Sequence, residues 1–356
     1  MAEPRSLPND AREIAVREHF RSQAAASDTL GSPFTAGLCR AIADVLDRNT
    51  LTGTRTLDWE DPRRDVLALR LCGGLHAIVL SGDDAVLAAA YPPAAVDEET
   101  LRRVLPEAIA RNDERLAASL ASAPQTNETA RSAMLLPGLL FIARETGLPL
   151  ALHEIGSSAG LNLLFDRFHY RYGDVEWGDP ASAVRLQPEV RGAPIPMDGV
   201  LNVLSRKGSD IAPVYVNDPA DRLRLRSYIW PDQTARLERL DAAIALAAAT
   251  PFGLERIDAA AFVRENHAAR LPGTAFVLLH TIMWQYMPRA TKDAILAVLQ
   301  EAGARATAEA PIARLRMEPG DPANNWAVLS LTLWPGGETR RLANCDYHGR
   351  WIEWIG

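Results

Sequence analysis

Residues 148–160 have the sequence LPLALHEIGSSAG, which separates a helical part of the chain from a part in which strands and helices alternate. The apolar run at 148–155 predicts a short buried strand. Gly156 and Gly160 enclose three small residues, which predicts a tight turn. The apolar spacing that follows predicts a helix over residues 160–168. A strand, a glycine turn and a helix in this order are typical of an α/β fold.

The sequence after this stretch repeats the alternation of strands and helices. The apolar runs predict strands at 210–216, 253–257, 274–280 and 312–317. Helical spacing predicts helices at 231–249 and 291–302. Residues 326–334 and 339–347 flank Pro-Gly-Gly and predict an antiparallel hairpin. We therefore expect a Rossmann-like, mostly parallel sheet with an antiparallel C-terminal hairpin.

The sequence before this stretch is helical in character. Apolar residues recur at helical spacing over residues 11–27, 33–47, 65–80 and 98–121. A further helix is expected from Thr126, with a kink at Pro137 and an end at Gly147. These patterns predict a helical N-terminal domain over residues 1–124 and a Rossmann-like domain over residues 125–356.

Composition narrows the class of protein. The 356 residues are 47% hydrophobic and carry a formal net charge of −7 without a long basic run, so a nucleic-acid footprint is not expected. The three cysteines are far apart, which favours buried thiols over a zinc site or a disulfide framework, and no metal cluster is expected. Without an apolar leader or spanning run, we expect a cytoplasmic protein with a small-molecule substrate and no membrane partner. The oligomeric state is left open.

The turn itself carries the residues that predict ligand binding. Glu154 lies two residues before the first glycine, whereas dinucleotide sites place their ribose-binding acid about 20 residues later. The predicted cofactor-binding residues of the turn and the helix behind it are Glu154, Gly156, Ser157, Ser158, Gly160 and Asn162.

An acid followed by this glycine pattern resembles the first motif of class I S-adenosylmethionine-dependent methyltransferases, with Ser158 in place of the middle glycine. The resemblance implies S-adenosylmethionine as cofactor, with Glu154 near its methionine or ribose part. It also implies ribose contact by Asp210 and adenine contact by Asp258 and Ala259. The fourth strand would end at the catalytic His280, with Trp284 and Tyr286 on the acceptor side.

A closer resemblance covers nearly the whole chain. QTNETARS at 125–132, HEIGSSAGLNLLFDRFHYRYG at 153–173 and YIWPDQ at 228–233 resemble an uncharacterised bacterial domain-of-unknown-function family (2332) with the signature E-[IV]-G-x-S-A-G-L-N-L. The resemblance implies a helical N-terminal part and a methyltransferase-like Rossmann part. It implies no reaction. It places Asn127 and Arg131, which are four residues apart, over the cofactor mouth as substrate residues.

Three alternatives stay open at this level. Gly156 to Gly160 also reads as G-x-S-x-G, which would make Ser158 the nucleophile of a serine hydrolase. Its partners would be Asp258 with His280, or Asp346 with His348. The other two alternatives are a non-catalytic protein that kept the ligand pocket and an NAD-type enzyme.

Overall fold

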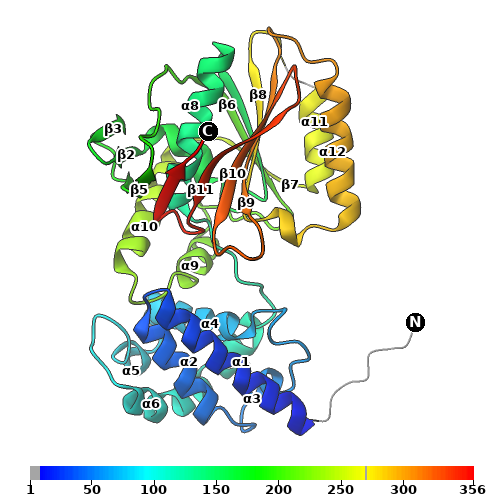
Figure 1. The fold of residues 1–356 in the computed structure, drawn as a ribbon. Helices are drawn as coiled ribbons and strands as arrows, with labels where there is room; N and C mark the ends of the chain where they lie inside the picture. The colour runs from blue at the N-terminus through cyan, green and yellow to red at the C-terminus, as the bar shows by residue number, and fades with distance from the viewer. Residues whose placement is uncertain (1–8, 269–270) are drawn as a thin grey trace. The chain divides into compact units, whose positions relative to one another are not determined.

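The computed structural model describes residues 9–268 and 271–356, which divide into two units (Figure 1). The helical unit comprises the described residues up to Thr126 together with Asp218–Glu238. The α/β unit comprises Asn127–Asn217 and the described residues from Arg239 to Gly356. The segment at 218–238, which the sequence placed with the Rossmann-like part, therefore packs with the N-terminal helices.

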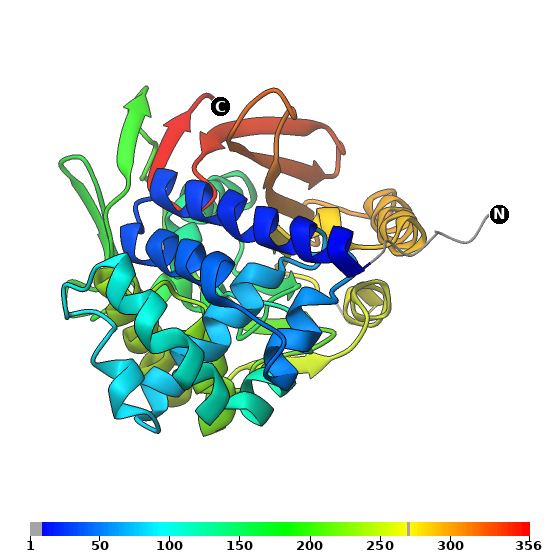
Figure 2. The same ribbon diagram turned by 90° about the horizontal axis from the view of Figure 1, so that it is seen from below.

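The helical unit is built as its apolar spacing predicts. Its helices are α1 (Asn9–Thr29), α2 (Pro33–Val45), α3 (Leu51–Leu57), α4 (Leu67–Ser81), α5 (Ala85–Ala88), α6 (Glu98–Arg111), α7 (Asp113–Ser119) and α9 (Pro219–Ser227). α1 and α2 pack side by side (Figure 2). The helix predicted over 98–121 is interrupted at Asn112, whose backbone closes α6 and whose side chain bonds to Ala108 O and Asp84.

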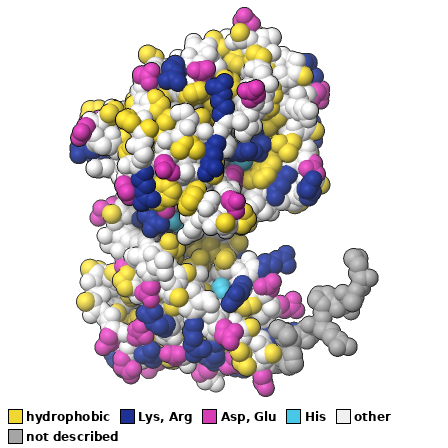
Figure 3. Space-filling model, in the orientation of Figure 1, with side chains coloured by type: hydrophobic (Ala, Val, Ile, Leu, Met, Phe, Trp, Pro, Cys, Tyr) yellow, Lys and Arg dark blue, Asp and Glu magenta, His cyan; other side chains and the backbone are white. Residues whose placement is uncertain are grey.

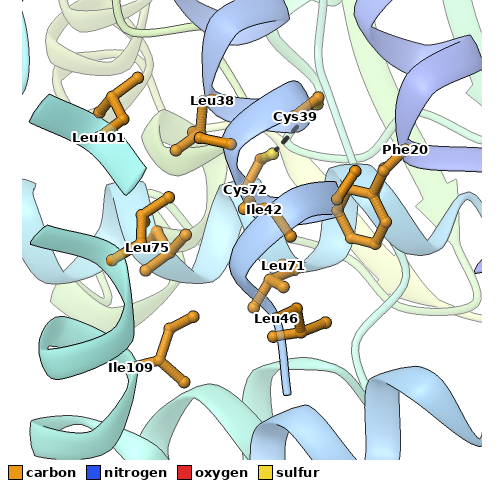
Figure 4. Close-up of a cluster of buried hydrophobic side chains, with 14 of the residues drawn as sticks. Phe20, Leu38, Cys39, Ile42, Leu46, Leu71, Cys72, Leu75, Leu101 and Ile109 are labelled. Carbon is orange, nitrogen blue, oxygen red and sulfur yellow. Dashed lines mark hydrogen bonds between the residues drawn. The ribbon is translucent and has the colours of Figure 1, made fainter. Parts of the chain in front are cut away.

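The core of the helical unit is a cluster of buried side chains from these helices (Figure 4). Leu38 and Ile42 lie four residues apart on α2, and Leu71 and Leu75 are spaced in the same way on α4, so each pair faces the core. Cys39 Sγ lies 3.7 Å from Cys72 Sγ within this cluster. The third cysteine, Cys345, is also buried as a free thiol. The expectation of buried thiols is confirmed.

The α/β unit contains a large, mostly parallel sheet. Its strands are β1 (Leu150–Ile155), β5 (Glu189–Gly192), β6 (Val203–Asp210), β7 (Gly253–Arg256), β8 (Ala275–Thr281), β9 (Ile312–Pro319), β10 (Ala327–Trp334), β11 (Thr339–Cys345) and β12 (Trp351–Trp354). The order is β5-β12-β11-β10-β9-β8-β1-β6-β7, and the strands from β9 to β7 are parallel. β10 and β11 form the predicted antiparallel hairpin. The chain lays β6 and β7 on one side of β1 and β8 and β9 on the other, so strand order reverses at β1.

Helices cover the two faces of this sheet. α8 (Ser132–Thr146) lies against β9 and β10, where a Cβ on Gly138 would meet Leu315 at 2.7 Å. α11 (Ala259–Ala268) and α12 (Arg289–Gly303) cover the other face over β1, β8 and β9 (Figure 1). The remaining elements are α10 (Thr234–Ala249), which runs across the division between the units, and the short 3-10 helices η1 (Thr129–Arg131), η2 (Leu161–Arg167) and η3 (Trp284–Tyr286).

Two local predictions differ from the structure, and one small sheet was not predicted. The segment after the glycine turn is the 3-10 helix η2 rather than an α-helix, and Leu163 N bonds to Gly160 O. The strand predicted at 210–216 lies earlier, as β6, where it pairs with β1. The sequence VLSRKGSD of β6 is mostly polar, so the apolar pattern did not predict a strand there. The residues after Phe168, for which the sequence predicted no strand, form a small second sheet of β2 (His169–Tyr172), β3 (Val175–Gly178) and β4 (Arg185–Leu186).

The surface agrees with the composition. Acidic and basic side chains both spread over the visible face of each unit (Figure 3). Across the described parts of the chain, no helix combines the length and the apolar character that crossing a bilayer requires.

Candidate functional site

The glycine turn follows β1 as predicted and is tightly packed. Gly156 and Gly160 have φ of +64° and +70°, values that L-residues rarely adopt. A Cβ on Gly156 would lie 2.8 Å from Met283, and one on Gly160 would lie 2.4 Å from Phe252. Ser158 between them has φ of +53°. The residue that replaces the middle glycine of the motif thus keeps a backbone conformation that favours glycine.

The amides of the turn bond largely to the protein itself. Ser157 N donates to Ser209 O at 3.0 Å, and Ser158 N donates to Asp210 Oδ2 at 2.9 Å. Leu161 N donates to Asn127 Oδ1 at 2.9 Å. Two residues predicted to touch ligand, Asp210 and Asn127, therefore hold the turn in place. Their predicted ligand contacts stay predictions.

Glu154 is the most unusual group at this edge of the sheet. Its side chain is 2% exposed, and its Oε2 has no hydrogen-bond partner among the residues that the structure describes. Burial raises the pKa of Glu154 to about 8 and outweighs the attraction of Arg131, while Asp210 pushes the pKa the same way as burial. The carboxyl group is therefore largely protonated at neutral pH.

Arg131 links η1 to β8 and to the loop after β11, and its charge acts on Glu154. Its Nε donates to Tyr347 O at 3.0 Å, and its Nη1 lies 3.5 Å from Thr281 Oγ1. Glu154 pairs in register with Leu279, so Thr281, two residues further along β8, is on the same face as Glu154. The predicted substrate residue Arg131 is thus brought to Glu154. Asn127 precedes η1 rather than sharing an α-helical face with Arg131.

A buried acid beside Arg131 was missed by sequence reasoning. Glu128 is 3% exposed, and its carboxylate lies 3.9 Å from Arg239 Nη2 and 3.9 Å from His348 Nδ1. The only sequence signal was its place between Asn127 and Arg131 in a polar segment directly before an apolar helix. The contact with His348 joins residues far apart in the chain, and no spacing pattern could indicate it.

His280, the predicted catalytic residue, lies on the opposite face of the sheet. Its Nδ1 is 2.6 Å from Glu318 Oε1, and its Nε2 accepts from Arg314 Nε at 3.2 Å. Trp284 stacks on the ring with 4.9 Å between centroids. Burial lowers the pKa of His280 although Glu318 acts to raise it. Both ring nitrogens are occupied, so this geometry supports a neutral, positioned ring. The catalytic role stays a prediction.

The remaining predicted residues are spread along the edge. Asp258 Oδ1 accepts from Ala260 N at 2.9 Å and caps α11, whose first residue is Ala259. Asn162 Oδ1 accepts from Ser132 Oγ at 2.7 Å. Tyr286 is 77% exposed. None of these contacts tests a ligand role, and each assignment stays a prediction.

One feature of the structure supports the serine-hydrolase alternative and one opposes it. Ser158 Oγ is buried, without a hydrogen-bond partner in the described residues. Asp346, however, binds Arg350 Nη2 at 2.7 Å and the backbone of His348, and Asp258 caps α11. In the described part of the chain, neither predicted Asp–His pair is joined through its side chains.

The described residues contain no group of three or more His, Cys, Asp or Glu side chains arranged to hold a metal ion. Residues 17–354 match the family described as "Uncharacterized protein conserved in bacteria (DUF2332)". The chain belongs to this family. No curated protein and no solved structure matches the DUF2332 chain. The family resemblance of the sequence is therefore confirmed, and the chemistry of the site has to be argued from its own residues.

Proposed function

We propose that this DUF2332 chain binds S-adenosylmethionine at the carboxyl edge of β1 and transfers its methyl group to a small molecule. The observation that carries the proposal is Glu154, a buried carboxyl group with an unpartnered oxygen at the end of the central strand. Strand order reverses at β1, and ligands of open α/β sheets bind at such a reversal.

The placement of three acids supports a nucleoside ligand. Glu154 is the second-last residue of β1, Asp210 ends β6 and Asp258 follows β7, so the acids lie at the same edge of adjacent parallel strands. The methyltransferase resemblance assigns these positions to the methionine or ribose part, the ribose hydroxyls and the adenine. Asp210 also holds Ser158 N, so it would accept a ribose hydroxyl while fixing the turn.

The left-handed backbone of Ser158 also supports the proposal. The methyltransferase pattern has glycine at this position, and Ser158 has φ of +53°. A serine pays a conformational cost in this region that glycine avoids. The turn thus keeps the shape of the glycine motif although the residue differs.

Electrostatics suit a cationic cofactor. Glu154 is largely protonated at pH 7 because burial raises its pKa to about 8, and a sulfonium nearby would favour its ionised form. S-adenosylmethionine supplies an electrophilic methyl group when bound. The protein's part would be to orient the acceptor and exclude water, which is catalysis by positioning. Arg131 and Thr281 lie on the side of Glu154 and would border the acceptor.

Calorimetry with S-adenosylmethionine and the neutral S-adenosylhomocysteine tests the proposal. We expect S-adenosylmethionine to bind the wild-type chain about tenfold more tightly at pH 9 than at pH 6.5, since Glu154 must ionise to pair with the sulfonium. S-adenosylhomocysteine should show little change. Glu154→Gln should remove the pH dependence, and the exposed Glu176→Gln should keep it. Absence of binding by both compounds to the wild-type chain would refute the proposal.

A serine hydrolase is the second candidate, and the backbone of Ser158 favours it. A serine at positive φ with an unpartnered hydroxyl after a strand is typical of a nucleophile elbow. A fluorophosphonate probe should then label the chain, and Ser158→Ala should abolish labelling. Labelling that is absent, or unchanged in Ser158→Ala, would exclude Ser158 as the nucleophile.

A further inference from the structure

A second charged group lies on the face of the sheet opposite Glu154. Arg314, Arg316 and Glu318 occupy alternate positions on β9, so their side chains share one face. His280 on β8 pairs in register with Arg316 and belongs to the same face. Lys and Arg side chains are visible over the region of β9–β11 in Figure 3.

Arg314 is buried without a carboxylate in direct contact from the part of the chain that the structure describes. Arg314 is 4% exposed. Among the described residues, its Nε and Nη2 form hydrogen bonds only with His280 Nε2, at 3.2 and 3.1 Å. Its guanidinium carbon lies 4.2 Å from the centroid of the Trp284 ring. No carboxylate of the described chain lies within ion-pair distance of Arg314. Burial and then the charge of Arg316 lower the pKa of Arg314 to about 10.

Arg316 adds a second positive charge beside it. This side chain is half-buried and makes no hydrogen bond or ion pair with the residues that the structure describes. The nearby acid is Glu318, but Glu318 Oε1 already accepts from His280 Nδ1 at 2.6 Å and from the backbone amides of Met283 and Trp284 at 3.3 Å. The charge of Glu318 acts on both arginines, and two guanidinium groups against one carboxylate leave an excess positive charge. Glu318 Oε2 has no hydrogen-bond partner among the described residues.

Hydroxyl groups lie next to the two arginines on the neighbouring strand. Ser330 of β10 pairs in register with Arg316, and Thr332 pairs with Arg314. Thr332 Oγ1 bonds to Thr339 Oγ1 at 2.7 Å. The Ser330 hydroxyl makes no hydrogen bond with another described residue. Two guanidinium groups and a hydroxyl group on one face of the sheet form a set of hydrogen-bond donors of the kind that oxyanions prefer.

We infer that Arg314, Arg316 and Ser330 form a binding site for an oxyanion, which is the phosphate or carboxylate group of a small ligand. Arg314 Nη1, which makes no hydrogen bond with the described residues, the Arg316 guanidinium and the Ser330 hydroxyl donate to its oxygens. Trp284 and His280 hold the Arg314 guanidinium in place. The inference does not depend on the proposed cofactor site, because Glu154 lies on the other face.

Titration of the full chain with sodium phosphate and with sodium acetate, followed by calorimetry and thermal unfolding, tests this site. Sodium chloride at matched ionic strength is the reference. We expect saturable binding that Arg316→Gln weakens by about tenfold, because a charged donor is lost. Arg340→Gln removes the same charge from β11 on the face of Phe141, and it should leave binding unchanged. Binding should also persist in Glu154→Gln.

The outcomes separate the alternatives. Binding of phosphate alone identifies a phosphate site, and binding of acetate as well identifies a carboxylate site. An effect that chloride reproduces, that Arg316→Gln leaves intact, or that Arg340→Gln weakens equally would overturn the inference. Arg316→Lys, which keeps the charge, should recover part of the affinity. Because Arg316 is half-buried, its variants test the site without emptying the core around Arg314.

Discussion

Glu154 and His280 lie near the carboxyl ends of the neighbouring strands β1 and β8, yet their side chains point to opposite faces of the sheet. Glu154 pairs in register with Leu279, the residue before His280. Glu154 therefore shares its surroundings with Arg131 and Asp210, whereas His280 contacts Glu318, Arg314 and Trp284. The two titratable groups belong to separate sites, and their roles can be tested separately.

Glu154 should make the free energy of unfolding depend on pH. Its pKa is about 8 in the folded chain and near 4.5 when unfolded, so the folded state holds the extra proton between these values. Stability from this group is present below about pH 4.5 and is lost as pH rises through 8. Glu154→Gln should be more stable than wild type at pH 9, by on the order of a few kcal/mol. Denaturant unfolding at pH 6 and 9 measures this, and equal pH slopes in both proteins would contradict it.

Ser158→Gly should stabilise the chain slightly. Ser158 has φ of +53°, where a side chain costs roughly 1–2 kcal/mol. Glycine has a larger conformational entropy in the unfolded chain, which offsets part of the stability gained. We expect a net gain of about 0.5 kcal/mol in urea unfolding. Ser157→Gly is the matched control and should destabilise, because Ser157 Oγ donates to Ser209 O. A loss of stability in Ser158→Gly would indicate that the Ser158 hydroxyl is needed in the fold.

Gly349→Ala should disturb the loop that supports Arg131. A Cβ at this position would lie 2.4 Å from Ala130 O, and φ is +74°. Gly173→Ala is the control, because Gly173 has φ of +61° with open space around it. We expect Gly173→Ala to cost roughly 1 kcal/mol from the backbone alone and Gly349→Ala to cost more.

The same pair of variants also reports on the site. If Arg131 borders the cofactor, Gly349→Ala should weaken S-adenosylmethionine binding and Gly173→Ala should not. Equal costs in thermal unfolding and equal binding would show that the contact between Gly349 and η1 does not position Arg131.

His280→Ala should destabilise the chain rather than only remove a base. The substitution leaves Glu318 and Arg314 without their shared partner, which should cost about 3 kcal/mol. His280→Gln keeps a donor and an acceptor and should cost less. If methyl transfer is found, a large fall in kcat with unchanged unfolding in His280→Gln would instead support a general base.

The acid side of the stability profile gives a second test of His280. Burial lowers its pKa, so the unfolded chain takes up the proton first as pH falls below about 6.5. Its contribution to stability is therefore present above that pH and is lost on acidification. His280→Gln should flatten this part of the profile, and an unchanged acid slope would contradict a neutral buried ring.

The sequence by itself determined the local shapes and their order. Apolar runs and glycines were sufficient to predict β1, β8, β9 and the hairpin, because apolar periodicity and turn-forming residues are properties of short segments. The same was true of most N-terminal helices. The position of strand β6 was not predicted, since its polar residues lie within the sheet only because the strand pairs with β1. The 3-10 form of η2 also escaped, because its turn is fixed by Asn127 and Asp210 from distant segments.

Only the tertiary structure decided which side chains meet. The sequence placed Glu154 and His280 at one strand edge, but the parallel register sends them to opposite faces. It gave no sign that Glu128 would approach His348. It also gave no sign that Arg314 and Arg316 would lie on one face of the sheet near Glu318. Register, face and charge balance depend on which strands become neighbours. That choice is made by packing of the whole sheet, which no short stretch of sequence contains.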